Sequence, residues 1–105
     1  MEKIDRESIA GLVDREDYRK IFSCLKEYGR VDTSLLSENI GKSREAVYKL
    51  TKEMEKVNVI KIDFEFLDSS KTLRSNLYSI KNNGAAKAFE DMVKRFEKKN
   101  QISTN

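Results

Sequence analysis

Residues 31–50, VDTSLLSENIGKSREAVYKL, decide the fold. Leucine and isoleucine recur at helical spacing in the first half, which predicts a short helix over residues 33–39. Gly41 then ends this helix, because glycine readily adopts the left-handed conformation of a sharp turn. Ser43 is a favourable N-cap for a second helix over residues 44–57. Two helices joined by so short a turn form a helix-turn-helix.

Each of the two helices has an apolar stripe and a polar face. Asp32 or Thr33 is expected to cap the first helix. The residues expected to face inward are Leu35, Leu36 and Ile40, then Val47, Leu50, Met54 and Val57. Basic and hydrogen-bonding side chains of the second helix lie off this stripe, so they are expected to face solvent or a partner.

A longer helix is predicted upstream, over residues 14–28. Asp14 would be its N-cap, acids follow in the first turn, and Gly29 would end it. Its apolar stripe comprises Tyr18, Ile21, Phe22, Leu25 and Tyr28. Residues 1–13 are open to two interpretations, a short helix capped by Asp5 or a loose arm.

The hydrophobic period changes from 3.6 to 2 downstream of the second helix. Residues 60–66, IKIDFEF, alternate apolar and charged side chains, which is typical of a half-buried strand. A turn at residues 68–71 and a second strand over residues 76–81 complete a hairpin, with a polar, basic tip at residues 68–75.

A last helix is predicted over residues 85–99, with residues 100–105 as a frayed tail. Its apolar positions are Ala85, Phe89, Met92, Val93 and Phe96. Four of these follow the four-three spacing of a coiled-coil seam. We expect them to pack on the same helix of a second copy, so that residues 85–99 form a dimerisation helix. The alternative is that this helix folds back on its own core.

Composition narrows the function classes. The chain has 105 residues, 38% hydrophobic and 37% charged, as expected for one small globular domain. It has no histidine and a single cysteine, so histidine-based catalysis is excluded and neither a metal site nor a cofactor is indicated. No apolar run suggests a membrane span or a signal peptide. We therefore expect a cytoplasmic protein that is not an enzyme.

Charge is distributed unevenly along the chain. Residues 1–41 hold seven Lys/Arg against nine Asp/Glu, whereas residues 42–105 hold fourteen against nine. The positive excess thus begins where the second helix of the helix-turn-helix begins. Such a field attracts nucleic acid, although scattered surface charge is the alternative interpretation.

Three helices followed by a hairpin are the element order of a winged helix, an α+β, mainly α, fold. Residues 14–84 resemble the winged helix-turn-helix regulators of the MarR- and ArsR-like groups, particularly their small archaeal and viral versions. The resemblance rests on Gly29-x-Val31, Leu36, Gly41-x-Ser43, Val47, Leu50, Ile60, Arg74-Ser-Asn-Leu-Tyr78-Ser-Ile80 and Gly84. It implies double-stranded DNA as the partner. The metal ligands of ArsR-like sensors and the extra helices around the MarR-like effector pocket are lacking, so no small-molecule effector is implied.

The second helix, residues 44–57, is the expected recognition helix in the major groove. Our candidates for contact with base edges are Arg44, Glu45, Tyr48 and Lys49. The alternative is a solvated face held by pairs four residues apart, such as Glu45–Lys49. Candidates for the DNA backbone are Thr33, Ser34, Lys42, Ser43 and Lys52.

The hairpin tip supplies further backbone or minor-groove candidates, which are Ser69, Ser70, Lys71 and Arg74. Arg74 has a rival role as an ion-pair partner of Asp63 or Asp68. Cys24 falls on the apolar stripe of its helix, which favours a buried free thiol over a disulfide between subunits.

Three functions fit these features. The first is a homodimeric, sequence-specific transcriptional regulator, whose two recognition helices would lie about 34 Å apart. The second is an architectural protein that coats DNA, although the net charge of +3 is low for that role. The third is a winged helix used for protein–protein contact in transcription or replication machinery, which the acids of residues 44–57 would suit.

Overall fold

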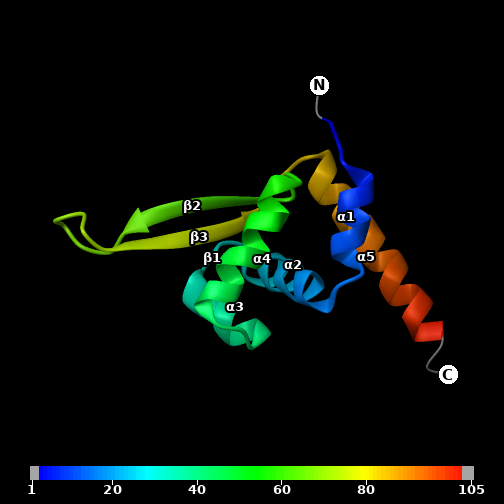
Figure 1. Ribbon diagram of the computed structural model, residues 1–105, viewed down its shortest axis with the longest axis horizontal. Helices are drawn as coiled ribbons and strands as arrows, with labels where there is room; N and C mark the ends of the chain where they lie inside the picture. The colour runs from blue at the N-terminus through cyan, green and yellow to red at the C-terminus, as the bar shows by residue number, and fades with distance from the viewer. Residues whose placement is uncertain (1–2, 103–105) are drawn as a thin grey trace.

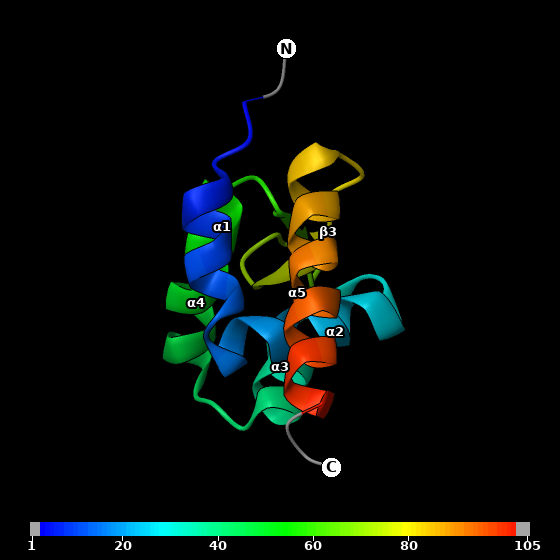
Figure 2. The same ribbon diagram turned by 90° about the vertical axis from the view of Figure 1, so that its right-hand side faces the viewer.

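The computed structural model describes residues 3–102 and has the predicted α+β, mainly helical, winged helix architecture (Figure 1). The elements run in the order α1 (Arg6–Val13), α2 (Glu16–Tyr28), β1 (Val31–Asp32), α3 (Thr33–Ile40), α4 (Arg44–Lys56), β2 (Ile60–Phe66), β3 (Arg74–Ile80) and α5 (Gly84–Ile102). The hairpin of β2 and β3 projects from one end of the molecule. At the other end, α1 and α5 lie side by side (Figure 2).

The helix-turn-helix forms as predicted from local signals. Asp32 caps α3 by accepting a hydrogen bond from the Leu35 backbone N–H at 2.9 Å. Gly41 ends α3 in the left-handed region, at φ 68° and ψ 36°. Ser43 then caps α4 by accepting from the Ala46 N–H at 3.2 Å. Each cap satisfies a backbone N–H that a helix end leaves without a partner, so this turn is encoded by its own residues.

The predicted start of α2 is wrong. Asp14 is not its N-cap, because Asp14 follows α1 in helical geometry, at φ −66° and ψ −18°, and donates its N–H to the Ala10 carbonyl. The extended residue that precedes α2 is Arg15, at φ −100° and ψ 128°, and its side chain makes no capping hydrogen bond. An N-cap residue has an extended backbone, whereas Asp14 keeps the helical backbone of the α1 helix that it ends.

The helical alternative for the N-terminal residues is confirmed. Asp5 caps α1 by accepting from the Ser8 N–H at 3.1 Å and from the Ser8 hydroxyl at 2.8 Å. Ile9 and Val13 are buried on the inner face of α1. This helix therefore belongs to the hydrophobic core and is not a loose arm.

The expected two-stranded wing is part of a three-stranded sheet, in the order β1-β3-β2. The two residues of β1 pair antiparallel with β3, with Val31 opposite Tyr78 and Asp32 opposite Leu77. Only two residues take part, which is too short a run to show a period of two in the sequence. β3 also begins at Arg74, two residues before the predicted start.

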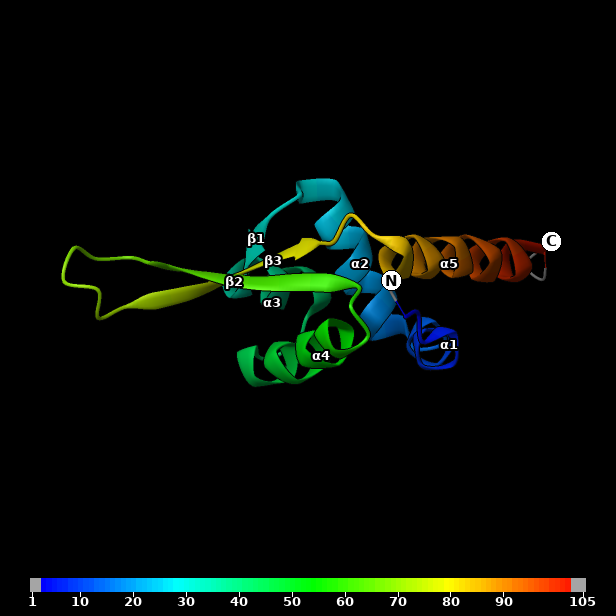
Figure 3. The ribbon, with the colours of Figure 1, turned by 90° about the horizontal axis from the view of Figure 1, so that it is seen from above.

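The hairpin is half-buried only near its base. Ile60 faces Ile80, and Ile62 faces Tyr78, under the helices. Farther out, Phe64 and Phe66 are 51% and 44% exposed, and Leu67 and Leu73 beside the tip are 64% and 61% exposed. The apolar alternation thus continues beyond the body of the domain, from which the two strands project (Figure 3).

The last helix packs mainly on its own chain. Ala85 and Phe89 are fully buried, and the centre of the Phe89 ring lies 4.7 Å from the centre of the Phe22 ring. The assignment of Ala85 and Phe89 to a dimer interface is therefore wrong, because the intrachain core already covers them. Met92, Val93 and Phe96 are only partly buried. The helix continues to Ile102, past the predicted end at residue 99, and residues 103–105 of the expected tail lie outside the described residues.

Two further side chains of α2 bear on the predictions. Cys24 is buried with a free thiol, as the first interpretation expects, and burial raises the pKa of that thiol. Tyr28, predicted in the apolar stripe, is instead 51% exposed, because it lies in the last turn of α2 before Gly29 turns the chain away. No helix in the described residues is long and apolar enough to cross a membrane.

Candidate nucleic-acid interface

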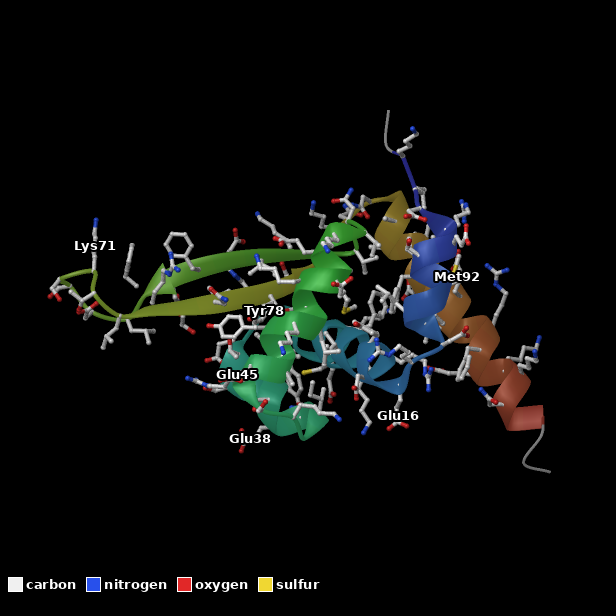
Figure 4. All side chains as sticks on the ribbon, in the orientation of Figure 1. Glu16, Glu38, Glu45, Lys71, Tyr78 and Met92 are labelled. Atoms are coloured by element: carbon white, nitrogen blue, oxygen red, sulfur yellow. The ribbon has the colours of Figure 1, made fainter. Side chains whose placement is uncertain are left out.

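The outer face of α4 is free of core contacts. Arg44, Glu45, Tyr48 and Lys49 are all exposed there, and Lys52 continues the same face one turn farther on. Val47, Leu50, Thr51 and Met54 are buried on the opposite face. Figure 4 shows Glu45 on the part of α4 that lies next to α3, on the side of the domain away from α5. The structure thus brings all four base-edge candidates to one helix surface.

Thr51 is a polar residue on the buried face of α4 that the sequence analysis did not single out. Its hydroxyl donates to the Val47 carbonyl at 2.7 Å, so the buried oxygen is satisfied within the helix. A polar residue can therefore sit on the inner face of α4 without a partner on another element.

Arg44 reaches across the turn to α3. Its guanidinium donates to the Ser34 hydroxyl, and both side chains are exposed. This contact joins a base-edge candidate to a backbone candidate at one surface point.

The alternative network of pairs four residues apart does not form on α4. Within residues 3–102, neither Lys49 nor Glu45 forms an ion pair. Instead, Lys52 lies 3.4 Å from Glu55, and Lys56 lies 3.8 Å from Glu53. Exposed pairs of this kind contribute at most about 1 kcal/mol, so they leave the lysines available to a phosphate.

The turn before α4 presents Lys42 and Ser43 to solvent. The Lys42 ammonium lies 3.8 Å from the Asp17 carboxylate of α2, and the Lys42 carbonyl accepts from the Ser37 hydroxyl. Ser43 uses its side-chain oxygen as the N-cap acceptor. Its hydroxyl proton is still available for donation to an anion.

Thr33 differs from the other backbone candidates. Its side chain is only 5% exposed, and its hydroxyl shares a hydrogen bond with the Tyr78 hydroxyl at 3.1 Å. The prediction that this side chain faces a DNA backbone is contradicted by its burial, and we leave it out of the interface. Thr33 is buried because it directly follows β1, which pairs with β3 and so places the start of α3 next to that strand.

The hairpin tip is organised by Asp68. Its carboxylate accepts from the backbone N–H groups of Thr72 at 2.9 Å and Leu73 at 3.0 Å, and from the hydroxyls of Ser70 and Thr72. These hydrogen bonds hold the pKa of the carboxyl well below its usual range, the Ser70 hydroxyl contributing most. The tip is therefore an ordered turn, although it is exposed.

Lys71 lies in that turn, with its side chain pointing sideways off the hairpin (Figure 4). Its φ of 60° is unusual for a residue other than glycine and follows from the tight path around Asp68. The exposed Ser69 and Ser70 flank it. Ser69, Ser70 and Lys71 are thus together in the turn at the end of the hairpin, whereas Arg74 begins β3.

Arg74 does not form the ion pair that was its rival predicted role. Its guanidinium lies 4.8 Å from the centre of the exposed Phe64 ring. Among the described residues it forms no ion pair with Asp63 or Asp68, and Asp63 is instead 3.8 Å from Arg30 and 3.5 Å from Lys61. The ring supports the guanidinium and leaves its edge open to solvent.

A groove of about 630 Å³ runs between the start of α2 and the flank of α4. It is lined by Arg15, Asp17, Tyr18, Lys42, Ala46, Tyr48, Lys49, Leu50, Lys52 and Glu53. Arg15 was not predicted from the sequence, because this residue belongs to the acid-rich part of the chain. Only the packing of α2 against α4 brings it beside the basic face.

Two of the remaining dimer candidates, Met92 and Phe96, lie where α1 and α5 meet, whereas Val93 lines a groove with residues of α2. Met92 and Phe96 line a surface groove of about 260 Å³ with residues of α1. The Arg19 guanidinium lies 3.9 Å from the centre of the Phe96 ring and donates to the Val13 carbonyl at 2.6 Å. Phe96 is therefore covered on one side by its own chain.

No group of three or more His, Cys, Asp or Glu side chains within residues 3–102 is arranged to hold a metal ion.

By architecture, the chain is a winged helix-turn-helix protein with a solvent-facing α4 and a projecting wing. Neither protein-family models nor curated proteins give a match to its sequence. Among solved structures, it is similar to a protein of Methanosarcina mazei Go1 that is described as a possible transcriptional regulator. The TM-score is 0.58 at 17% sequence identity, over 93% of this chain and 83% of that one. This likeness shows a shared fold.

Proposed function

We propose that this protein is a homodimeric, sequence-specific double-stranded DNA-binding protein that regulates transcription. One observation carries the proposal: the face of α4 that no part of the core covers holds Arg44, Tyr48, Lys49 and Lys52 together. The similarity of the fold to that of a possible transcriptional regulator supports the same function.

In the proposed complex, α4 enters the major groove. Arg44, Glu45, Tyr48 and Lys49 contact base edges, since their side chains combine hydrogen-bond donors, acceptors and an apolar ring. Arg44 is already tied to Ser34, so it enters the groove with part of its conformational freedom removed.

Backbone phosphates are contacted on both sides of α4. Lys42, Ser43, Ser34 and Lys52 do so from the helix-turn-helix. The wing tip, residues 68–75, reaches the minor groove or the adjoining backbone, with Lys71 in the turn at its end. Because Asp68 holds the tip in one conformation, little chain entropy is lost when the wing binds.

The proposed dimer uses the end of the molecule that is farthest from the wing. There α1 and α5 lie side by side (Figure 2). Met92 and Phe96 remain partly exposed between them, and Val93 remains partly exposed beside α2. A two-fold axis near these residues would point both wings outward. Two recognition helices would then meet successive half-sites on one face of the duplex.

The test is selection of a random duplex library on the purified protein at about 150 mM salt, close to physiological ionic strength. Enrichment of an inverted repeat supports a dimeric regulator. Retention of DNA without a motif supports an architectural protein instead. If no DNA is retained, the proposal fails and protein partners become the object of the search.

A pair of double variants makes this test specific. Arg44→Ala/Lys49→Ala removes two charges from the outer face of α4, and Arg6→Ala/Lys87→Ala removes two exposed charges from α1 and α5. Loss of DNA binding in the first variant alone supports the α4 interface. Equal loss in both variants indicates nonspecific attraction and contradicts it. Light scattering of the unbound protein measures the dimer separately.

A further inference from the structure

The groove between α2 and α4 has a guanidinium held in place at its edge. Arg15 lies 5.0 Å from the centre of the Tyr18 ring, and its guanidinium is 3.5 Å from the Tyr18 hydroxyl. The Tyr18 ring is itself buried, at 2% exposure, whereas Arg15 is exposed. A rigid part of the core thus fixes the position of an exposed cation.

The charge of the groove is positive. Arg15, Lys42, Lys49 and Lys52 line it, against two carboxylates, Asp17 and Glu53. Both carboxylates already have a cationic neighbour, since Asp17 is 3.8 Å from Lys42 and Glu53 is 3.8 Å from Lys56. The groove therefore complements an anion.

We propose that this groove seats the backbone phosphates of the DNA strand that runs beside α4, and that Arg15 is a phosphate-contacting residue. The inference rests on the proposed function, because it assigns a further contact of the same complex. Tyr48 and Lys49 line the groove as well as the outer face of α4, so the two surfaces are continuous.

A phosphate suits this place better than a base does. The groove lies on the flank of α4 that faces α2, beside the surface that would face the floor of the major groove. A guanidinium can donate two parallel hydrogen bonds to phosphate oxygens, which gives direction as well as attraction. With the wing on the other side of α4, Arg15 would fix how α4 enters the groove.

The experiment compares the parent with Arg15→Ala, using Arg6→Ala as the control that removes an equal charge from α1. Affinity is measured by fluorescence anisotropy at several salt concentrations, on the selected duplex and on an unrelated duplex. Arg15→Ala is expected to weaken binding to both about tenfold, the scale of one hydrogen bond to a charged group. The slope of log affinity against log salt should fall by about 0.9.

Phosphate ethylation interference locates the contact. The parent is expected to lose binding when one particular phosphate beside each half-site is ethylated, and Arg15→Ala should no longer respond to that phosphate. Arg15→Gln, which keeps much of the side chain on Tyr18, repeats the measurement if Arg15→Ala melts at a lower temperature.

The outcomes separate this inference from the function on which it rests. If Arg15→Ala binds like the parent while Arg44→Ala or Lys71→Ala binds more weakly, the groove assignment is overturned and the proposed function stands. An effect confined to the selected duplex means base reading and also overturns the phosphate assignment. If the parent binds neither duplex, the proposed function itself fails.

Discussion

The hydroxyl groups of Thr33 and Tyr78 share a buried hydrogen bond, 3.1 Å long, that joins the first residue of α3 to the middle of β3. The Asn76 amide lies 3.4 Å from the same Tyr78 oxygen. Through this contact the helix-turn-helix is attached to the strand that carries the wing. The two parts of the proposed DNA interface are thereby held in a fixed relation.

Removing either hydroxyl should destabilise the fold. Thr33→Val and Tyr78→Phe each leave the other oxygen short of a buried partner, at a cost of about 1 to 3 kcal/mol. The double variant should cost less than the sum of the two, because the shared hydrogen bond can be lost only once. Urea unfolding of all four proteins measures the coupling free energy. Strict additivity would mean that the two hydroxyls do not interact in solution.

The structure also predicts where along β2 the core ends. Ile60 is fully buried and Phe66 is 44% exposed, although both belong to the same alternating face. Ile60→Ala is expected to lower the free energy of unfolding by about 2 to 5 kcal/mol. Phe66→Thr, which retains a strand-favouring residue, should change it by less than about 1 kcal/mol. A large loss of stability in Phe66→Thr would show that the outer wing packs on something.

Local signals were sufficient for the helix-turn-helix. Gly41 adopts the left-handed backbone that ends α3, and the Ser43 hydroxyl caps α4, both as the sequence predicts. Asp14 has an equally good capping side chain, but it is the C-cap residue of α1 and has a helical backbone. A capping residue therefore marks a helix start only where the residue before it is not itself helical.

Long-range packing explains what the sequence analysis missed. Thr33 resembles a surface cap in sequence, and only its pairing across 45 residues with Tyr78 shows that it is buried. Phe64 and Phe66 alternate as a buried strand does, yet the helices end before they reach them. Arg15 joins the basic face only because α2 packs beside α4. A sequence pattern reveals which face a residue occupies, but not how far the neighbouring element extends.

The pH behaviour of the wing tip follows from Asp68. The Ser70 and Thr72 hydroxyls and the backbone N–H groups of Leu73 and Thr72 lower the pKa of its carboxyl in the folded state. A lowered pKa stabilises the turn above the unfolded pKa, about 3.9, and this contribution is lost as the pH falls through the folded value. The Thr72 and Leu73 amide chemical shifts should therefore stay constant from pH 7 to about 4. An inflection near pH 4 would contradict the hydrogen bonds.

Asp68→Ala tests the same turn at neutral pH. Without the carboxylate, the Thr72 and Leu73 N–H groups lose their acceptor, so both amides should exchange faster with deuterium. The melting temperature should barely change, because the tip is exposed and makes no contribution to the core. Ser69→Ala, which alters an exposed neighbour, is the matched control.

Cys24 should be unreactive until the protein unfolds. It is 4% exposed, and burial raises the pKa of its thiol, so both access and the reactive thiolate are suppressed at pH 8. Labelling with a chromogenic disulfide reagent is expected to be slow in buffer and complete in denaturant. A dimer that is separated by a reducing agent would instead show that the sulfur reaches a partner subunit.

The proposed interface predicts different effects for Arg44→Ala and Lys71→Ala. Arg44 is placed on the face that would meet base edges, so its loss should relax sequence preference by about 1 to 3 kcal/mol at one position of the half-site. Lys71, at the end of the wing, should contact only backbone, so its loss should weaken binding equally on all duplexes and reduce the salt slope by about 0.9. Both can be measured by repeating the duplex selection and the salt titration with each variant, with Arg6→Ala as the control for an exposed charge on α1. If Arg44→Ala and Lys71→Ala both retain the parent's motif and affinity, the residues assigned to the interface are wrong even if the protein binds DNA.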